Sequence, residues 1–254
     1  MTARTATART AMILPSPPGA DAYLAVDKRS GIAVHGPGGL LGSLRERFGA
    51  ELALVHRLDK ETSGVLLLAR NAEALRAAHA VWRRDVVKTY LAVTRGVPSP
   101  AEGRVDAPLL ENRTSRPDLL KRAVKAAYGA SRAGHLLSGR RVLAIQPLPP
   151  PGRTAVHPAG RPAATRYRML EDRGATALVE LVPETGRMHQ LRVHLLHLGT
   201  PLLADPLYDP RHAASDPPPF LHAARLVWAD PPGMPRGTAW TWEAPLPAPA
   251  VPGP

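Results

Sequence analysis

The feature that most constrains the fold is a continuous apolar run of strand length at residues 64–70, GVLLLAR. A strand with one face in water alternates apolar and polar side chains, whereas this run has no polar residue before its final arginine. The run therefore predicts a strand that other elements cover on both faces. A chain of 254 residues can supply those covering layers in one large domain or in two modest ones.

Strand patterns and a few helical patterns surround this run. Further strands are expected over residues 22–27, 87–95, 164–170, 176–182, 221–228 and 238–243. Helices are expected after Gly39 with Leu41, Leu44 and Phe48 on one face, over 72–84 with Asn71 as the N-cap, and over 189–198. Together, these expected strands and helices predict an α+β fold with a mixed, mainly antiparallel β-sheet core and flanking helices.

We expect a single domain over residues 20–246, with disordered tails at 1–19 and 247–254. The first residues are mostly threonine, alanine and arginine, and they lack the apolar stretch of a secretion signal. A short targeting segment is the alternative for this end of the chain. The C-terminal residues are rich in proline and alanine, which favours an irregular tail.

Positive charge is concentrated in one part of the chain. Residues 112–168 contain 12 lysines and arginines and one acid, Asp118, so nearly all of the net charge of +12 lies there. We interpret 113–162 as a basic insertion, helical at 118–128 and otherwise loop, because it is proline-rich and interrupts the strand pattern. Such a field indicates a polyanionic partner, and a solvated basic loop without a partner is the alternative.

The composition also excludes some classes of protein. The chain has no cysteine, which rules out disulfides and a thiolate zinc site. No apolar run approaches the roughly 20 residues that a membrane-spanning helix needs. We therefore expect a protein without a membrane partner, in a reducing compartment such as the cytoplasm.

The first cluster of chemically active residues is the run HRLDKETSG at 56–64. Asp59 lies among the cations Arg57 and Lys60, which favour its carboxylate form, and it precedes a turn into the apolar strand. A carboxylate at the start of a strand can reach a substrate at the sheet edge, where it could act as a nucleophile or base. The alternative is a turn aspartate in a surface salt bridge.

The second cluster, at 184–208, combines arginines and histidines on a predicted helix. His194 and His197 are three residues apart, which could suit a metal, but neither a nearby carboxylate nor a cysteine offers an obvious third ligand. We therefore expect no metal. Arginines such as Arg192, on a helix beside a loop, more plausibly hold a phosphate or an active-site carboxylate.

These two clusters resemble motifs of the RluA-type pseudouridine synthases. Residues 56–64 are similar to the family's HRLDxxTSG motif, and 186–194 (GRMHQLRVH) to GRxHQIRVH, with Met188 in place of threonine or serine. Residues 198–208 resemble the end of HLGHPLxGDPLY, with departures at Thr200 and Ala204.

Three further segments resemble the family in the same order along the chain. Residues 88–92 (KTYLA) are similar to the KxYxA strand, and 221–223 to the LHA element. Residues 22–35 resemble the opening strand, with Arg29 and Ser30 in place of Pro-Ala. The resemblance covers roughly 22–112 and 162–246, and it implies the pseudouridine synthase fold with one catalytic domain.

The resemblance implies three catalytic residues. Asp59 corresponds to the catalytic aspartate, which either attacks C1′ or takes the C2′ proton. Tyr90 corresponds to the tyrosine that stacks on the target base and helps to remove the C5 proton. Arg192 corresponds to the basic residue that pairs with the catalytic carboxylate.

The resemblance also implies substrate contacts. Arg57 corresponds to an arginine that fills the place of a flipped-out base. The other expected substrate-binding residues are His56, Arg187, His189 and Leu191. The implied reaction is cofactor-free isomerisation of uridine in RNA, by a monomeric cytoplasmic enzyme.

The implied RNA is large-subunit ribosomal RNA, because 54–70 looks most like the ribosomal branch. Transfer RNA is the first alternative, and a non-catalytic RNA-binding protein that keeps the fold is the second. A carboxylate glycosidase would need a second acid, and Glu61 is too close to Asp59 in sequence to be that acid.

Overall fold

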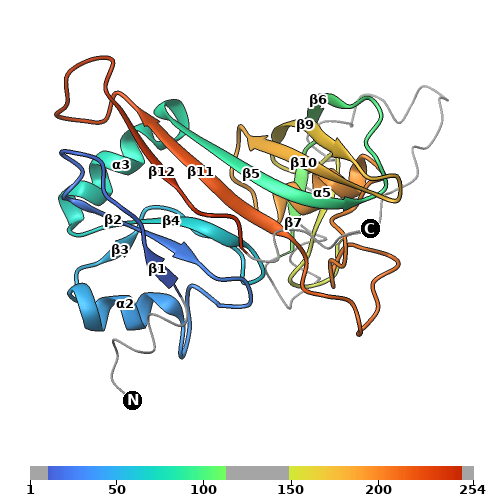
Figure 1. The fold of residues 1–254 in the computed structure, drawn as a ribbon, viewed down its shortest axis with the longest axis horizontal. Coiled ribbons are helices and arrows are strands. Elements are labelled where there is room, and N and C mark those ends of the chain that lie inside the picture. Colours follow the sequence, from blue (N-terminus) through green and yellow to red (C-terminus); the bar gives the residue numbers. More distant parts are fainter. Residues whose placement is uncertain (1–10, 113–148, 248–254) are drawn as a thin grey trace, which may run out of the picture.

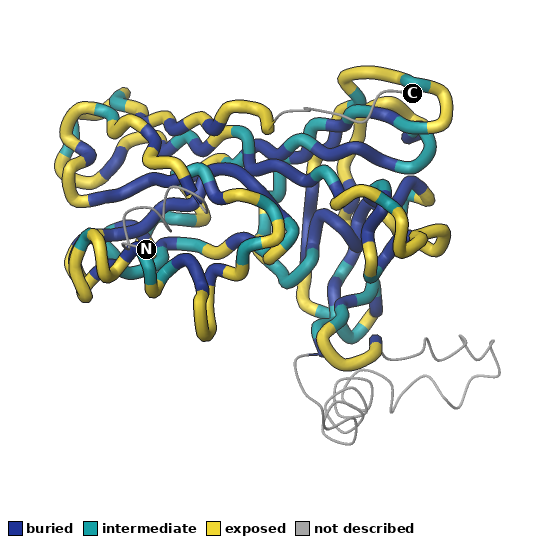
Figure 2. The backbone as a smooth tube through the Cα atoms, turned by 60° about the horizontal axis from the view of Figure 1, so that its bottom comes forward, coloured by how far each residue is buried: buried dark blue, intermediate teal, exposed yellow. Residues whose placement is uncertain are grey.

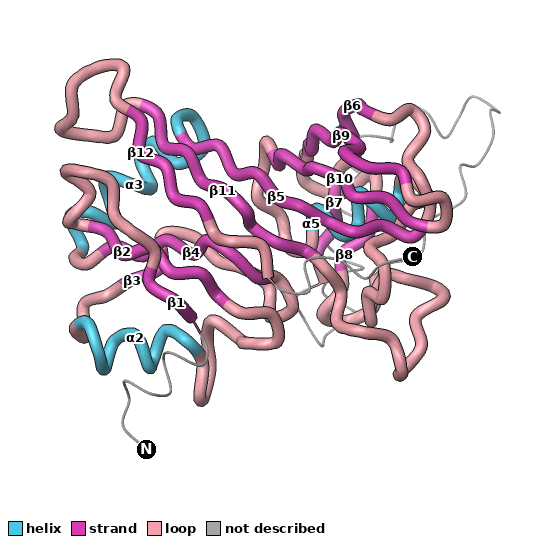
Figure 3. The backbone as a smooth tube through the Cα atoms, viewed as in Figure 1, coloured by secondary structure: helices cyan, strands magenta, loops and turns pink. Residues whose placement is uncertain are grey.

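In the computed structural model, the described residues are 11–112 and 149–247, and they form twelve strands and three helices (Figures 1 and 3). The strands are β1 (Ala11–Ile13), β2 (Tyr23–Lys28), β3 (Ala53–Leu54), β4 (Ser63–Ala69), β5 (Val86–Arg95), β6 (Glu102–Asp106), β7 (Leu109–Glu111), β8 (Thr154–Val156), β9 (Ala164–Asp172), β10 (Thr176–Pro183), β11 (Leu221–Ala229) and β12 (Ala239–Glu243). The helices are α2 (Leu40–Phe48), α3 (Ala72–Asp85) and α5 (Gln190–His197).

One ten-stranded sheet organises the fold. Its order is β1-β2-β4-β11-β5-β10-β9-β6, with β12 also paired to β11 and β3 to β4. Every pairing is antiparallel except that of β4 with β11, while β7 and β8 form a small sheet of their own. The expected α+β fold with a mixed, mainly antiparallel sheet is therefore confirmed.

The long strands β5 and β11 join two lobes (Figure 1). The first lobe contains β1 to β4, β12, α2 and α3, and the second contains β6 to β10 and α5. β5 pairs with β11 on one side and with β10 on the other, so it belongs to both lobes. Residues on these two strands can therefore face the space between the lobes.

The apolar run forms β4, and all seven residues of β4 are buried. Figure 2 shows buried backbone running through the interior of the molecule, with exposed loops at its periphery. Successive side chains point to opposite faces. Leu66 and Leu68 pack in the cluster that also contains Leu40 and Leu44 of α2. Val65, Leu67 and Ala69 pack in the other cluster, with Ala74 and Ala78 of α3 and with the tryptophans of β11 and β12. The prediction of a strand covered on both faces is confirmed.

Two expected boundaries differ in the structure. Residues 11–13 pair with β2, so the described part of the N-terminal tail predicted over 1–19 includes an ordered edge strand. The end of the predicted insertion at 113–162 also belongs to the fold, because β8 pairs with β7. Short strands of this kind depend on their partners, which the local sequence does not show. The helix predicted at 118–128 and the tails 1–10 and 248–254 lie outside the described residues.

The parallel contact between β4 and β11 depends on a glycine. Gly64 has φ +104°, and a Cβ atom at this position would lie 2.3 Å from the carbonyl oxygen of Ala223. In the next register pair, Ser63 Oγ hydrogen-bonds to His222 Nδ1 at 2.9 Å inside the protein. The two strands can approach this closely only because residue 64 has no side chain.

We predict that Gly64→Ala destabilises the protein by about 3 kcal/mol or more, because it adds both backbone strain and a steric overlap. The free energy of unfolding, measured by urea denaturation, checks this. Gly42→Ala in α2 is the matched control, because nothing lies within 4 Å of a Cβ there. The control should be neutral or stabilising by up to about 1 kcal/mol. Equal stabilities for the two variants would contradict the close packing of β4 on β11.

Candidate active site

A cavity of about 500 Å³ lies between the two lobes. Its walls come from the loop between β3 and β4, the end of α3, the start of β5, the end of β10 and the start of α5. All eight residues expected to act in catalysis or substrate binding line it: His56, Arg57, Asp59, Tyr90, Arg187, His189, Leu191 and Arg192. Segments more than 130 residues apart in sequence therefore meet at one place.

Asp59 lies in the loop that leads into β4, where its backbone carbonyl accepts a hydrogen bond from the Thr62 N–H. Its side chain is 22% exposed, so the carboxylate is sheltered but reachable. The two acids on the cavity wall are Asp59 and Glu184, and Glu184 pairs with Arg104 and Arg166. Among the described residues, no lysine or arginine lies within ion-pair distance of Asp59.

Lys28 supports the same loop from inside the protein and was missed as a site residue at the sequence level. Its side chain is fully buried, and its ammonium donates to the carbonyls of Arg29, Ile32 and Lys60 at 2.9, 2.9 and 3.0 Å. Burial lowers the pKa of Lys28 to about 8, while Glu61 and Asp59 act in the opposite direction. A lysine at the end of a mostly apolar strand was the available signal.

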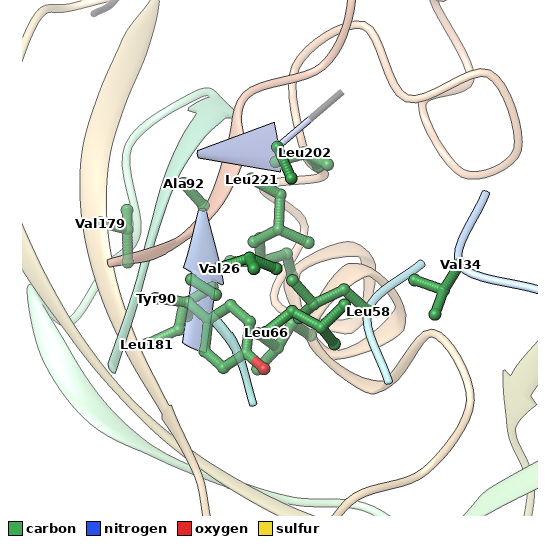
Figure 4. Close-up of a cluster of buried hydrophobic side chains, with 14 of the residues drawn as sticks. Val26, Val34, Leu58, Leu66, Tyr90, Ala92, Val179, Leu181, Leu202 and Leu221 are labelled. Atoms are coloured by element: carbon green, nitrogen blue, oxygen red, sulfur yellow. The ribbon is translucent and has the colours of Figure 1, made fainter. Parts of the chain in front are cut away.

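Tyr90 lies on β5, opposite Leu181 of β10 and Ala223 of β11. Figure 4 shows its ring beside Leu181 and Leu66, and Leu191 belongs to the same apolar cluster. Burial, together with the negative charge of Asp59, raises the pKa of Tyr90 above its ordinary value. The phenol is therefore neutral and has an apolar ring face beside the cavity.

Arg192 lines the cavity but is bound by a different carboxylate from the one expected. Its Nε and Nη2 donate to Asp205 at 2.7 and 2.5 Å, and Asp205 is fully buried. Burial alone would lower the pKa of Arg192, but the hydrogen bonds and charge of Asp205 raise it, with a smaller effect from Asp59. Within the described residues, Arg192 therefore pairs with the buried Asp205 and not, as expected, with Asp59.

His189 is the side chain that approaches Asp59. Its Nε2 is 4.0 Å from Asp59 Oδ2, and its Nδ1 is hydrogen-bonded to the Tyr208 hydroxyl at 2.8 Å. Burial lowers the pKa of His189, although the charge of Asp59 opposes this. Tyr208 was not among the expected site residues, and its place in the DPLY stretch was the only signal for it.

His56 lines the cavity, but its hydrogen-bonding capacity is used by the protein. Its Nε2 accepts from the Leu67 N–H of β4 at 3.1 Å, and its ring stacks on Trp82 at 5.1 Å. Burial and the nearby charge of Lys88 lower the pKa of His56 to about 3, so the ring is neutral. This geometry fits an anchor for the Asp59 loop better than the expected polar contact to substrate.

The histidines of α5 do not form a metal site in the described residues. His194 is buried, and its two ring nitrogens contact Thr165 Oγ1 at 2.9 Å and the Ala107 carbonyl at 3.2 Å. Nowhere in 11–112 and 149–247 do three or more His, Asp or Glu side chains gather in a way that could hold a metal ion. In the same ranges, no helix is long and apolar enough to cross a membrane.

Four cationic side chains, which we call the rim, line the cavity on both lobes. They are Arg57, Arg83, Lys88 and Arg187, and the described residues place no carboxylate within ion-pair distance of these four. The pKa of Arg187 is lowered by burial and by the nearby charges of Arg161 and Arg83. The rim is therefore positive on both lobes, and it shares the cavity with the carboxylate Asp59.

Comparisons of sequence point to one family. Residues 22–197 match the RNA pseudouridylate synthase family. An uncharacterized RNA pseudouridine synthase of Chloroflexus aurantiacus is 37% identical over 87% of this chain, and the ribosomal large subunit pseudouridine synthase C of Yersinia pestis is 35% identical over 89%. The mitochondrial pseudouridylate synthase RPUSD4 of Xenopus tropicalis is 40% identical over 72%. The chain spans 56–63% of the length of these three relatives.

Comparison with solved structures points to the same family. The structure of human RNA pseudouridylate synthase domain containing 4 superposes with a TM-score of 0.69 and 28% identity, covering 98% of this chain and 93% of that one. Human RNA pseudouridylate synthase domain containing 1 superposes with a TM-score of 0.62 and 25% identity, covering 86% and 78%. Sequence match and fold agree, and the chain belongs to the RNA pseudouridylate synthase family.

Proposed function

We propose that this chain is an active pseudouridine synthase that converts uridine to pseudouridine in RNA, with Asp59 as its essential carboxylate. The observation that carries the proposal is the placement of Asp59: a sheltered carboxylate that has no lysine or arginine partner among residues 11–112 and 149–247, in a cavity with Tyr90 and Arg192. An unneutralised carboxylate keeps the nucleophilicity and basicity that the reaction requires.

The reaction detaches uracil from its ribose, turns it, and rejoins it through C5, so that atoms balance without a cofactor. Asp59 must be ionised, either to attack C1′ or to take the C2′ proton. The Tyr90 ring offers a face for the detached base, and its raised pKa keeps the hydroxyl protonated and able to donate a hydrogen bond. Leu191 adds apolar contact beneath the base.

The target atoms are inaccessible in a stacked helix, so the uridine must leave the stack to enter the cavity. Arg57 is exposed on the cavity wall, close in sequence to Asp59, which suits a residue that occupies the vacated space. Flipping costs a few kcal/mol, and contacts with Tyr90 and Arg57 can offset it.

Large-subunit ribosomal RNA is the substrate that we propose. Several relatives carry names that specify the large ribosomal subunit, including those of Yersinia pestis and Escherichia coli. Mapping pseudouridines in all cellular RNA from a strain without the gene tests this, because a lost site in transfer RNA would reject ribosomal RNA as the target. The monomeric state and the cytoplasmic location stay predictions.

We predict that Asp59→Asn abolishes pseudouridine formation and leaves RNA affinity within about twofold of wild type. The amide is similar in size to the carboxylate but has neither its charge nor its basicity. A tritium-release assay on 5-tritiated RNA measures turnover, and filter binding measures affinity.

Glu61→Gln is the matched control, because it removes a carboxylate two residues away in the same loop. It should keep turnover near that of wild type. Turnover by Asp59→Asn at the level of this control would reject Asp59 as the essential carboxylate.

The rim predicts a salt-sensitive interaction. Arg83→Glu and Arg187→Glu should each weaken RNA binding and reduce the slope of log affinity against log salt concentration by about 0.7, the value for one phosphate contact on single-stranded nucleic acid. Filter binding over a series of salt concentrations measures both quantities.

Arg76→Glu makes the same change of charge on α3, at an exposed position that does not line the cavity. It should leave the slope close to that of wild type. If all three variants lower affinity equally, the net charge rather than the rim governs binding.

A further inference from the structure

We propose that His189 is a positioning residue that holds the Asp59 carboxylate through a neutral Nε2–H, and that Tyr208 selects this tautomer. The inference deepens the proposed function and rests on it. It adds an element to the site that none of the comparisons describes: two hydrogen bonds that link the backbone of β8 through Tyr208 to His189, whose Nε2 lies 4.0 Å from the essential carboxylate.

The backbone places His189 in an unusual conformation. Its φ of 54° and ψ of 21° are left-handed, a region that non-glycine residues seldom adopt and that recurs at functional sites. His189 is the residue before α5, but its side chain makes no capping hydrogen bond to that helix. The left-handed turn instead directs the imidazole between Tyr208 and Asp59.

The hydrogen bonds of Tyr208 determine where the histidine proton lies. The Tyr208 oxygen accepts the backbone N–H of Thr154 at 2.9 Å, and it is 2.8 Å from His189 Nδ1. The phenol has one proton, and among the residues that the structure describes Nδ1 is the remaining hydrogen-bond partner to which it can donate. Nδ1 then accepts, so the proton of a neutral imidazole must be on Nε2.

The Nε2–H faces Asp59 Oδ2 across 4.0 Å, and the two side chains are 13% and 22% exposed. A small movement, such as closure of the cavity around RNA, brings this pair to hydrogen-bond length. A neutral donor fixes the direction of the carboxylate without cancelling its charge. The carboxylate can then meet the sugar in a single orientation and remain reactive.

Burial of His189 favours this neutral form, although the nearest charge, that of Asp59, acts against it. Burial lowers the pKa of His189, Arg192 and Arg57 act in the same direction, and Asp59 and Asp205 oppose them. Because Arg192 and Asp205 pair with each other, their opposing effects largely cancel. A protonated histidine would form an ion pair with Asp59 and quench it, which is the arrangement that this environment disfavours.

The first test observes the tautomer directly in the folded wild-type protein. Long-range 15N–1H correlation spectra at neutral pH should show His189 with a proton on Nε2 and none on Nδ1. Tyr208→Phe should shift His189 toward a mixture of tautomers. An imidazolium or an Nδ1–H form in wild type overturns the proposal, whatever the enzyme's activity.

The second test separates positioning from RNA binding. His189→Ala removes the donor and should lower kcat about 100-fold, the scale on which misplaced catalytic groups slow a reaction. RNA affinity should stay within about twofold of wild type. His189→Gln places an amide N–H near the position of Nε2, and it should recover about tenfold of the loss. His197→Ala, on the exposed side of the same helix, is the matched control.

Each outcome of the kinetic test supports or overturns the proposal. Recovery by glutamine at unchanged affinity supports it. Equal kcat for the alanine and glutamine variants overturns it, as does a loss of affinity that accounts for the lost activity, because His189 would then be a substrate ligand. If wild-type protein forms no pseudouridine in any RNA, the proposed function fails, and the tautomer in the folded protein still decides the inference.

Discussion

The site depends on the position of Ala223 on β11, because Ala223 is paired with Gly64 of β4 on one side and with Tyr90 of β5 on the other. The glycine lets β4 approach β11 so closely that a Cβ atom would overlap the Ala223 carbonyl. This contact fixes the start of β4 and with it the loop that carries Asp59. The antiparallel pairing of β11 with β5 fixes the position of Tyr90. β10 pairs with the other side of β5, and the chain then leads from β10 to α5. The spacing between the carboxylate and the tyrosine therefore follows from strand register rather than from any direct contact between them.

The long elements of this fold could be predicted from sequence because each carries its own pattern. The buried run of β4, the alternation in β9 and the Asn71 cap of α3, which accepts from the Ala74 N–H at 2.8 Å, all appear where expected. The short strands β1, β3, β7 and β8 could not be predicted in this way. Each has two or three residues and exists through its pairing with a strand elsewhere in the chain. A local pattern has no information about such partners.

The expected site residues do meet in one cavity, but the sequence could not assign their partners. Arg192 was expected to pair with Asp59, and nothing in the motif indicated that Asp205 would be its partner instead. The buried Asp205 accepts both guanidinium hydrogen bonds and also those of the Leu207 and Tyr208 N–H groups, which fix its orientation. The chain reaches Asp205 through Ala204, which has a left-handed φ of 60° at a position where the family usually has glycine. The glycine of the family motif indicated the left-handed backbone at residue 204, but the motif did not indicate the ion pair between Arg192 and Asp205.

The charges of the site fall into two groups. Arg192 on the cavity wall is neutralised by the buried Asp205, and burial keeps His56, His189 and the hydroxyl of Tyr90 uncharged. Cations without a carboxylate partner among the described residues form the rim, on both lobes. A polyanion would be attracted to that rim by long-range electrostatics, which weaken with salt. For the role that we propose for Asp59, a cation in direct contact would be unfavourable, since it would stabilise the carboxylate and reduce its reactivity. Placing a neutral histidine beside Asp59 and the arginines farther out satisfies both requirements within one small cavity.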